Sequence, residues 1–140
     1  ILYPERHWNY FAEYTRDLPP SAEIFLRLER EETKYLQGAG RPDDFSERTE
    51  NLTTAIATLS TRNLLRGLSA SITGTYSHLD GLTDADRYSA RTALRWNISK
   101  SFVELKSHYN YSRSKSTLGR RELTTTEEIL LFFRLVRKLF

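Results

Sequence analysis

Hydrophobic and polar residues alternate with a period of two along most of this chain, which predicts β-strands. Residues 88–98 give the clearest case. Their even-numbered positions are aromatic, aliphatic or small, while their odd-numbered positions are mainly arginine, serine and asparagine. A strand places two such sets on opposite faces, whereas a helix would scatter them. We therefore expect an all-β protein whose strands have one apolar and one polar face.

The remaining strands follow from the same pattern, although it is weaker at residues 47–61, where the two faces are ambiguous. The last segment has two interpretations. Thr125 and Glu128 resemble a helix capping box, and Arg134, Arg137 and Lys138 would share one face of a basic amphipathic helix. We favour a strand there, because the preceding segments form an unbroken series of hairpins. The predicted strands are residues 8–18, 22–36, 47–61, 68–78, 88–98, 101–113 and 124–140.

The connections between these strands are predicted to alternate in length. Short ones fall at Pro19–Pro20, at 62–65 and at Ser99–Lys100, and long polar ones at 37–46, 80–86 and 114–123. Short turns on one side and long loops on the other are typical of outer-membrane β-barrels. A soluble up-and-down barrel or sandwich produces the pattern less regularly.

With these hairpins, the chain resembles the bacterial outer-membrane β-barrel proteins as a broad class. The resemblance implies a single domain over residues 1–140, an antiparallel up-and-down meander of about seven strands that is part of a transmembrane β-barrel. It also implies the outer membrane of a Gram-negative bacterium as location and the lipid bilayer as partner. Phe140 is similar to the terminal aromatic residue of this class, although Lys138 and Arg134 interrupt the apolar set that normally precedes it.

The first strand would run toward the short turn at Pro19–Pro20, and seven is an odd number, whereas bacterial single-chain barrels usually have an even number of strands. We therefore expect this to be the C-terminal part of a larger barrel, completed by strands upstream of Ile1 or by a partner chain. The chain has no methionine and no recognisable signal peptide at its start, which suggests a processed product or a piece of a longer protein.

Aromatic residues are predicted to gather at two heights. By strand direction, four tyrosines lie at the outer rim and Trp96 at the inner rim, as aromatic girdles do at membrane interfaces. The alternative is ordinary cross-strand packing in a soluble sheet. The predicted interface residues are Tyr76, Tyr88, Trp96, Tyr109 and Tyr111.

Composition narrows the possible functions. The net charge is +3 and basic residues are interleaved with acids, so no nucleic-acid footprint is evident. The absence of cysteine excludes disulfides and thiolate sites, and the longest apolar run, residues 129–133, is too short for a membrane helix. We expect no cofactor, no metal site and no enzymatic activity. Asp80, Asp84 and Asp86 could suggest calcium, but their spacing favours a solvated loop.

Two groups of charged residues on the polar face are candidate pore-lining residues. Arg87, Arg91 and Arg95 form a ladder that would favour anions or acidic sugars in a pore. We favour the alternative that Glu104 or other neighbouring acids balance this charge. Glu104, Lys106 and His108 share a face on the next strand. Three functions remain open: a porin-like or export channel wall that passes solutes or polymers, a structural barrel that sheaths or anchors a partner protein in the outer membrane, and a soluble up-and-down β protein that binds an apolar ligand.

Overall fold

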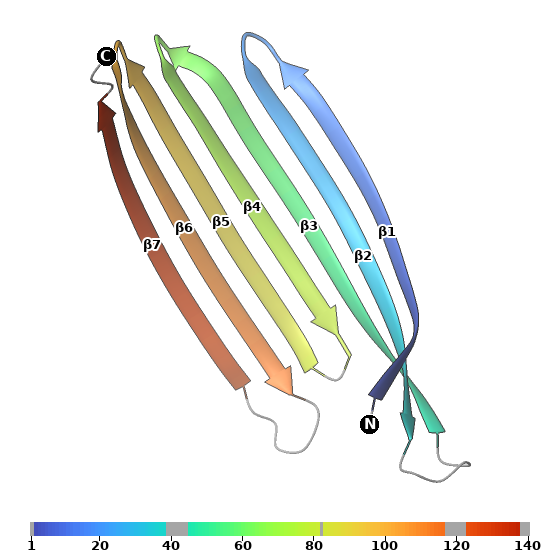
Figure 1. The fold of residues 1–140 in the computed structure, drawn as a ribbon. Coiled ribbons are helices and arrows are strands. Elements are labelled where there is room, and N and C mark those ends of the chain that lie inside the picture. The colour runs from blue at the N-terminus through green and yellow to red at the C-terminus, as the bar shows by residue number, and fades with distance from the viewer. Residues whose placement is uncertain (1, 39–44, 82, 117–122, 138–140) are drawn as a thin grey trace.

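The computed structural model of the chain describes residues 2–38, 45–81, 83–116 and 123–137. These residues form one sheet of seven antiparallel strands in sequential order, so every strand pairs with its neighbours in the sequence. The sheet is long, twisted and curved (Figure 1). No helix in the described part is long and apolar enough to cross a membrane. The strands are β1 (Leu2–Leu18), β2 (Ala22–Gly38), β3 (Phe45–Leu65), β4 (Leu68–Asp80), β5 (Thr83–Ile98), β6 (Ser101–Ser116) and β7 (Leu123–Arg137).

The all-β fold, the meander and the number of strands are confirmed. The helical alternative for the last segment is wrong, because Leu123–Arg137 pairs along its length with β6. Residues 138–140, and with them the terminal aromatic, lie outside the described residues, as do residues 39–44 of the connection predicted at 37–46. Among the described strands β1 and β7 make no contact, so the sheet is not closed.

Two predicted connections are wrong. Residues 80–86 do not form a long loop, because β4 ends at Asp80 and β5 begins at Thr83, and Asp84 and Asp86 lie within β5. The strict alternation of short and long connections therefore fails at this hairpin. The acidic residues resembled a loop in the sequence, but they continue the two-residue period of the strand beyond its apolar part.

The turn predicted at 62–65 lies further along the chain. β3 continues to Leu65 through an irregularity in its pairing between Thr61 and Leu65, where Asn63 has a φ of 60°. The reversal occurs at Arg66–Gly67, and Gly67 has a φ of +80°, a conformation that glycine adopts without strain. The Gly67 carbonyl accepts a hydrogen bond from the Asn97 amide at 2.8 Å, which ties this turn to the end of β5.

The strands are staggered across the sheet. At the loop end β1, β2 and β3 extend further than β4 to β7, whereas at the turn end β5, β6 and β7 extend further than β1 and β2. A row of directly opposed residues therefore crosses the sheet obliquely to its ends, as it does in strands that tilt around a barrel axis. That row consists of Tyr14, Leu26, Ala57, Gly74, Ala90, Tyr109 and Ile129.

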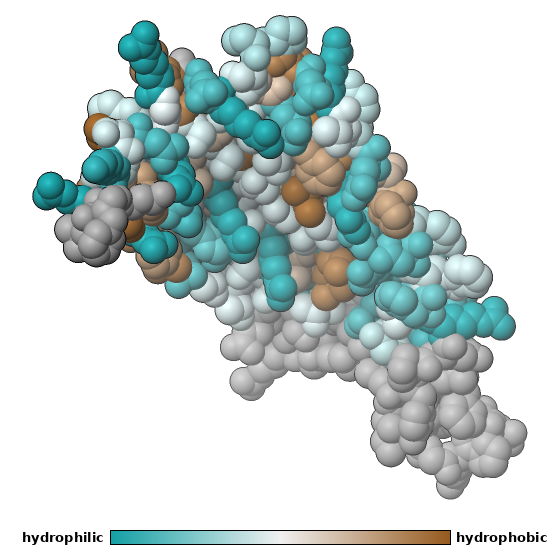
Figure 2. All heavy atoms as spheres, turned by 45° about the horizontal axis from the view of Figure 1, so that its top comes forward, coloured by the Kyte–Doolittle hydropathy of each residue, from teal (hydrophilic) through white to brown (hydrophobic). Residues whose placement is uncertain are grey.

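The described part of the chain has almost no interior. Ala85, 8% exposed, is its single buried residue. Figure 2, turned so that the turn end comes forward, shows long hydrophilic side chains between pale and apolar surface on the visible side. One sheet alone cannot bury a core, because a sheet must pack one face against another layer or close on itself.

Candidate functional site

The two faces of the sheet differ sharply in chemistry. Directly opposed residues share a face, so the observed register extends the face assignment of β5 to all seven strands. We call the face that carries Leu94 the apolar face and the one that carries Arg91 the polar face. Of 21 large hydrophobic side chains that are exposed among the described residues, all but Phe11, Leu130 and Phe132 lie on the apolar face.

This register also resolves the faces of β3, which the sequence left ambiguous. Ala55, Ala57 and Leu59 lie on the apolar face, opposite Leu28, Leu26 and Ile24 of β2.

Tyrosines mark one boundary of the apolar surface, where the predicted outer rim lies. The Tyr76 and Tyr88 ring centroids are 4.8 Å apart, and those of Tyr88 and Tyr111 are 6.0 Å apart. Tyr109 lies one step closer to the middle of the same face. The structure thus brings together the four tyrosines that the sequence assigned to one rim, and we call them the tyrosine belt.

Beyond the tyrosine belt, the same face becomes charged. The Asp86 carboxylate accepts a hydrogen bond from the Tyr76 hydroxyl at 3.0 Å and lies 2.8 Å from Nδ1 of His78. The hydrogen bonds from His78 and then Tyr76, with the nearby charges of His78 and Arg113, lower the pKa of Asp86. These hydrogen bonds join β4 and β5 immediately outside the apolar surface.

The other boundary lies at the turn end. Trp96, the predicted inner-rim residue, is half exposed on the apolar face, between Leu68 of β4 and Val103 of β6. The apolar stretch therefore runs from Tyr88 to Ile98 in β5, which is eleven residues, and from Leu68 to Tyr76 in β4, which is nine.

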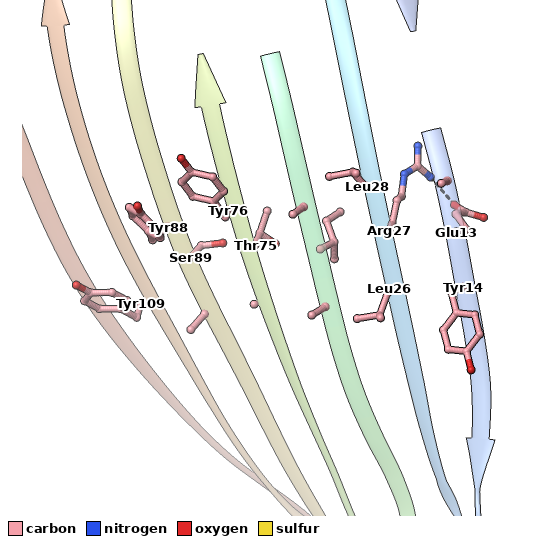
Figure 3. Close-up of a pocket in the computed structure, with 16 residues that line it drawn as sticks. Glu13, Tyr14, Leu26, Arg27, Leu28, Thr75, Tyr76, Tyr88, Ser89 and Tyr109 are labelled. Atoms are coloured by element: carbon pink, nitrogen blue, oxygen red, sulfur yellow. Dashed lines mark hydrogen bonds and ion pairs between the residues drawn. The ribbon is translucent and has the colours of Figure 1, made fainter. Parts of the chain in front are cut away.

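A shallow hollow of about 700 Å³ lies in the middle of the apolar face. Small residues such as Ala57, Gly74 and Ala90 line its floor. In Figure 3, Tyr76, Tyr88 and Tyr109 stand on one side of it, and Leu26, Leu28 and Tyr14 on the other.

On the polar face, the three predicted arginines follow β5 at every fourth residue. Arg91 Nε donates to Nε2 of His108 at 3.3 Å, and Arg95 Nε donates to Oδ1 of Asn97 at 3.3 Å. The Arg95 guanidinium also lies over the Phe102 ring, 4.3 Å from its centroid. Arg87 lies between Ser77 and Ser112 on the neighbouring strands.

Glu104 was expected to balance the charge of the β5 arginines, but it forms an ion pair with Lys106 instead. Glu104 lies directly opposite Arg95, but its Oε1 lies 3.1 Å from the Lys106 ammonium of its own strand. His108 contacts Arg91 rather than Glu104. Within the described residues, therefore, none of the three β5 arginines forms an ion pair with a carboxylate, and Glu104, Lys106 and His108 do not join in one hydrogen-bonded set.

The acidic part of the polar face was not predicted from the sequence. On β1 and β2, Arg27 is held between Glu13 at 2.8 Å and Glu29 at 2.9 Å, and Asn9 donates to Glu29 at 2.7 Å. The only signal in the sequence is that charged residues, mainly acids, recur at odd positions of residues 22–36, at Glu23, Arg27, Glu29 and Glu31. This face carries five carboxylates on β1 and β2 against one arginine: Glu13, Asp17, Glu23, Glu29 and Glu31 against Arg27.

The described residues contain no group of three histidine, aspartate or glutamate side chains that could hold a metal ion. Neither a protein-family model, nor a curated protein, nor a solved structure matches this chain. The functional argument therefore rests on the two faces of the sheet.

Proposed function

We propose that this chain is part of the wall of a β-barrel in the outer membrane of a Gram-negative bacterium, porin-like or an export channel. Its apolar face contacts lipid, and its polar face lines a water-filled interior that hydrophilic solutes or polymers cross. One observation carries the proposal: the apolar surface is a band that runs on one face from the turn end to the tyrosine belt, with charged residues beyond the tyrosines.

The width of the band supports a bilayer as its surroundings. A tilted transmembrane strand needs about 9–11 residues. The apolar stretches of β4 and β5, nine and eleven residues long, match that length. The strands themselves extend further, β3 to 21 residues, and its next residues on the same face, Thr53, Asn51 and Thr49, are polar. In the interior of a soluble barrel, that face would have to bury the charges of Asp86 and its neighbours.

The exposure of the apolar side chains in the band supports lipid, rather than water, as what contacts them. Leu131 and Phe133 of β7 are 73% and 71% exposed, and most other large side chains of the apolar face are about half exposed. Water-soluble monomers rarely expose continuous apolar patches of more than a few hundred Å². A bilayer covers such a surface without any specific partner.

The outer edges of the sheet, on β1 and β7, have backbone groups that need hydrogen-bond partners. Unpaired backbone groups are too costly in hydrocarbon, so only closed barrels cross a membrane as strands. We propose that additional strands, from sequence upstream or from a partner chain, pair with β1 and β7.

The alternative of a barrel that sheaths a partner has one observation in its favour. Leu130, Phe132 and Val136 of β7 lie on the polar face, Val136 directly opposite Phe102, where water alone would not favour them. A protein inside the barrel would cover them. The soluble alternative is favoured by the hollow in the apolar face, which could hold an apolar ligand.

Detergent dependence tests the membrane proposal. The protein should aggregate in buffer alone, remain dispersed in detergent, and float with liposomes after reconstitution and alkaline washing. A monodisperse protein in detergent-free buffer would overturn both membrane functions. Conductance in planar bilayers then separates an open channel, which should conduct, from a barrel filled by a partner, which should not.

A further inference from the structure

The polar face is divided by charge into an acidic and a basic part. The acidic part is β1 and β2, with the five carboxylates described above. The basic part is formed by β5, β6 and β7, whose described polar-face residues include Arg87, Arg91, Arg95, Lys106 and Arg134 against Glu104 and Glu128. Between them, β4 presents only Ser, Thr and one Leu on this face, from Ser69 to Leu79.

The two parts also differ in how their charges are used. Arg27, in the acidic part, is paired with two carboxylates. Arg91 and Arg95 donate to His108 and Asn97 rather than to a carboxylate. All three arginines of β5 are exposed. An arginine has five N–H donors in a planar fork that matches carboxylates and phosphates, and most of these donors remain available on β5.

The spacing of the arginines selects the shape of the ligand. Residues four apart along a strand are about 13 Å apart, since each residue rises about 3.3 Å. Side chains at that distance do not converge on one small anion. They fit a ligand that is extended along the strand and carries negative charges at intervals.

The neighbouring strands select its chemistry. Parallel to the arginines runs the β4 row of hydroxyl groups, Ser71, Thr73 and Thr75 among them, and on the other side lie Asn110 and Ser112 of β6. A row of hydroxyl and amide groups beside a row of guanidinium groups complements a chain that alternates hydroxyls with carboxylates. An aromatic ring, Phe102, lies at the end of the row under Arg95.

We propose that the polar-face residues of β4, β5 and β6 form a binding track for an acidic polysaccharide, with Arg87, Arg91 and Arg95 as its anchoring residues. This inference rests on the proposed function, since it makes an acidic polymer the solute that contacts this part of the wall. The acidic part on β1 and β2 repels the same polymer and confines it to β4–β6.

The test measures binding of a galacturonic-acid hexamer to the full-length protein in detergent by isothermal titration calorimetry, with a neutral glucose hexamer as the control ligand. Three proteins are compared: the unmodified one, the triple variant R87S/R91S/R95S, and R27S. The R27S control removes one arginine from the same face outside the track. Each arginine that makes a charge-assisted bond is worth roughly tenfold in affinity.

We expect the acidic hexamer to bind in preference to the neutral one, more weakly as salt rises, because exposed charges are screened within about 10 Å at 0.1 M salt. The triple variant should lose at least about a hundredfold in affinity, whereas R27S should not lose any.

The proposed binding track would be rejected if the acidic and neutral hexamers bound equally, or if the triple variant bound the acidic hexamer as tightly as the unmodified protein. Liposome flotation of the same proteins reports on the membrane proposal separately. Flotation without selective binding rejects the track and keeps the barrel wall, whereas selective binding by a protein that does not float rejects the barrel wall and keeps the track.

Discussion

Tyr76 and Tyr88 face each other across β4 and β5 with ring centroids 4.8 Å apart, at the position where the apolar face gives way to charged residues. Below the pair lie Gly74 and Ala90, and above it lie His78 and Asp86. This pair therefore marks the height at which the side chains of this face change from apolar to charged. Tyrosine suits that position because its ring is apolar and its hydroxyl is polar.

Replacing Tyr88 with alanine should destabilise the protein by about 1–3 kcal/mol, because the substitution removes both ring contacts as well as apolar area. Urea unfolding of the reconstituted protein measures this. Tyr10 is the matched control, since it is 59% exposed on the edge strand β1 and has no ring contact among the described residues. Equal losses for the two substitutions would show that the belt has no special role.

A charge placed on the apolar face should cost far more than one placed on the polar face. Leu94→Arg should lower the free energy of unfolding in liposomes by about 2–4 kcal/mol, the cost of arginine near the middle of a bilayer. Ala93→Arg, one residue away on the polar face, should cost less than about 1 kcal/mol. If the two variants unfold alike, lipid does not cover the apolar face.

Gly67 should resist substitution because of its backbone conformation. Its φ is +80°, and a Cβ there would collide with the carbonyl oxygen of Asn97. Gly67→Ala should therefore destabilise by roughly 1–3 kcal/mol. Gly74→Ala provides the control, since its Cβ would meet no atom within 4 Å. A neutral effect at Gly67 would contradict the observed turn at Arg66–Gly67.

Asp86, which lies outside the apolar band, should make stability depend on pH in the acid range. Its pKa is lowered in the folded state by the hydrogen bonds from His78 and Tyr76. A lowered folded pKa means that the carboxylate stabilises the protein above its unfolded pKa of about 3.9, and that this contribution disappears as pH falls through the folded value. Asp86→Asn should thus lower the thermal midpoint at pH 7, and the difference should vanish in strong acid. A difference that persists there would mean that the carboxylate charge is not its source.

The sequence predicted the fold well because a two-residue period is a local signal. The strands, their order and the face of nearly every apolar residue follow from alternation and short turns. The errors fell where the alternation continues with charged residues, as at Asp84 and Asp86, or where a strand is irregular, as between Thr61 and Leu65. Neither feature has a local signal that distinguishes it from a loop.

The candidate site was predictable only in part. The arginines of β5 share a face by spacing alone, so their row was evident. Glu104 pairs with Lys106 and not with Arg95 because of side-chain geometry across two strands. The spacing of residues in the sequence does not determine that geometry. The separation of acidic from basic strands likewise becomes evident only when the register aligns all seven strands on common faces.

Cysteine scanning along β5 tests the central claim most directly, because the chain contains no cysteine of its own. Single cysteines at Ala90, Arg91, Thr92, Ala93 and Leu94 would be placed in the reconstituted protein and treated with a charged, membrane-impermeant thiol reagent. Our account predicts that positions 91 and 93 react and that positions 90, 92 and 94 are protected by lipid. Reaction at all five positions, or the inverse pattern with 90, 92 and 94 reactive, would contradict the assignment of the apolar face to the bilayer.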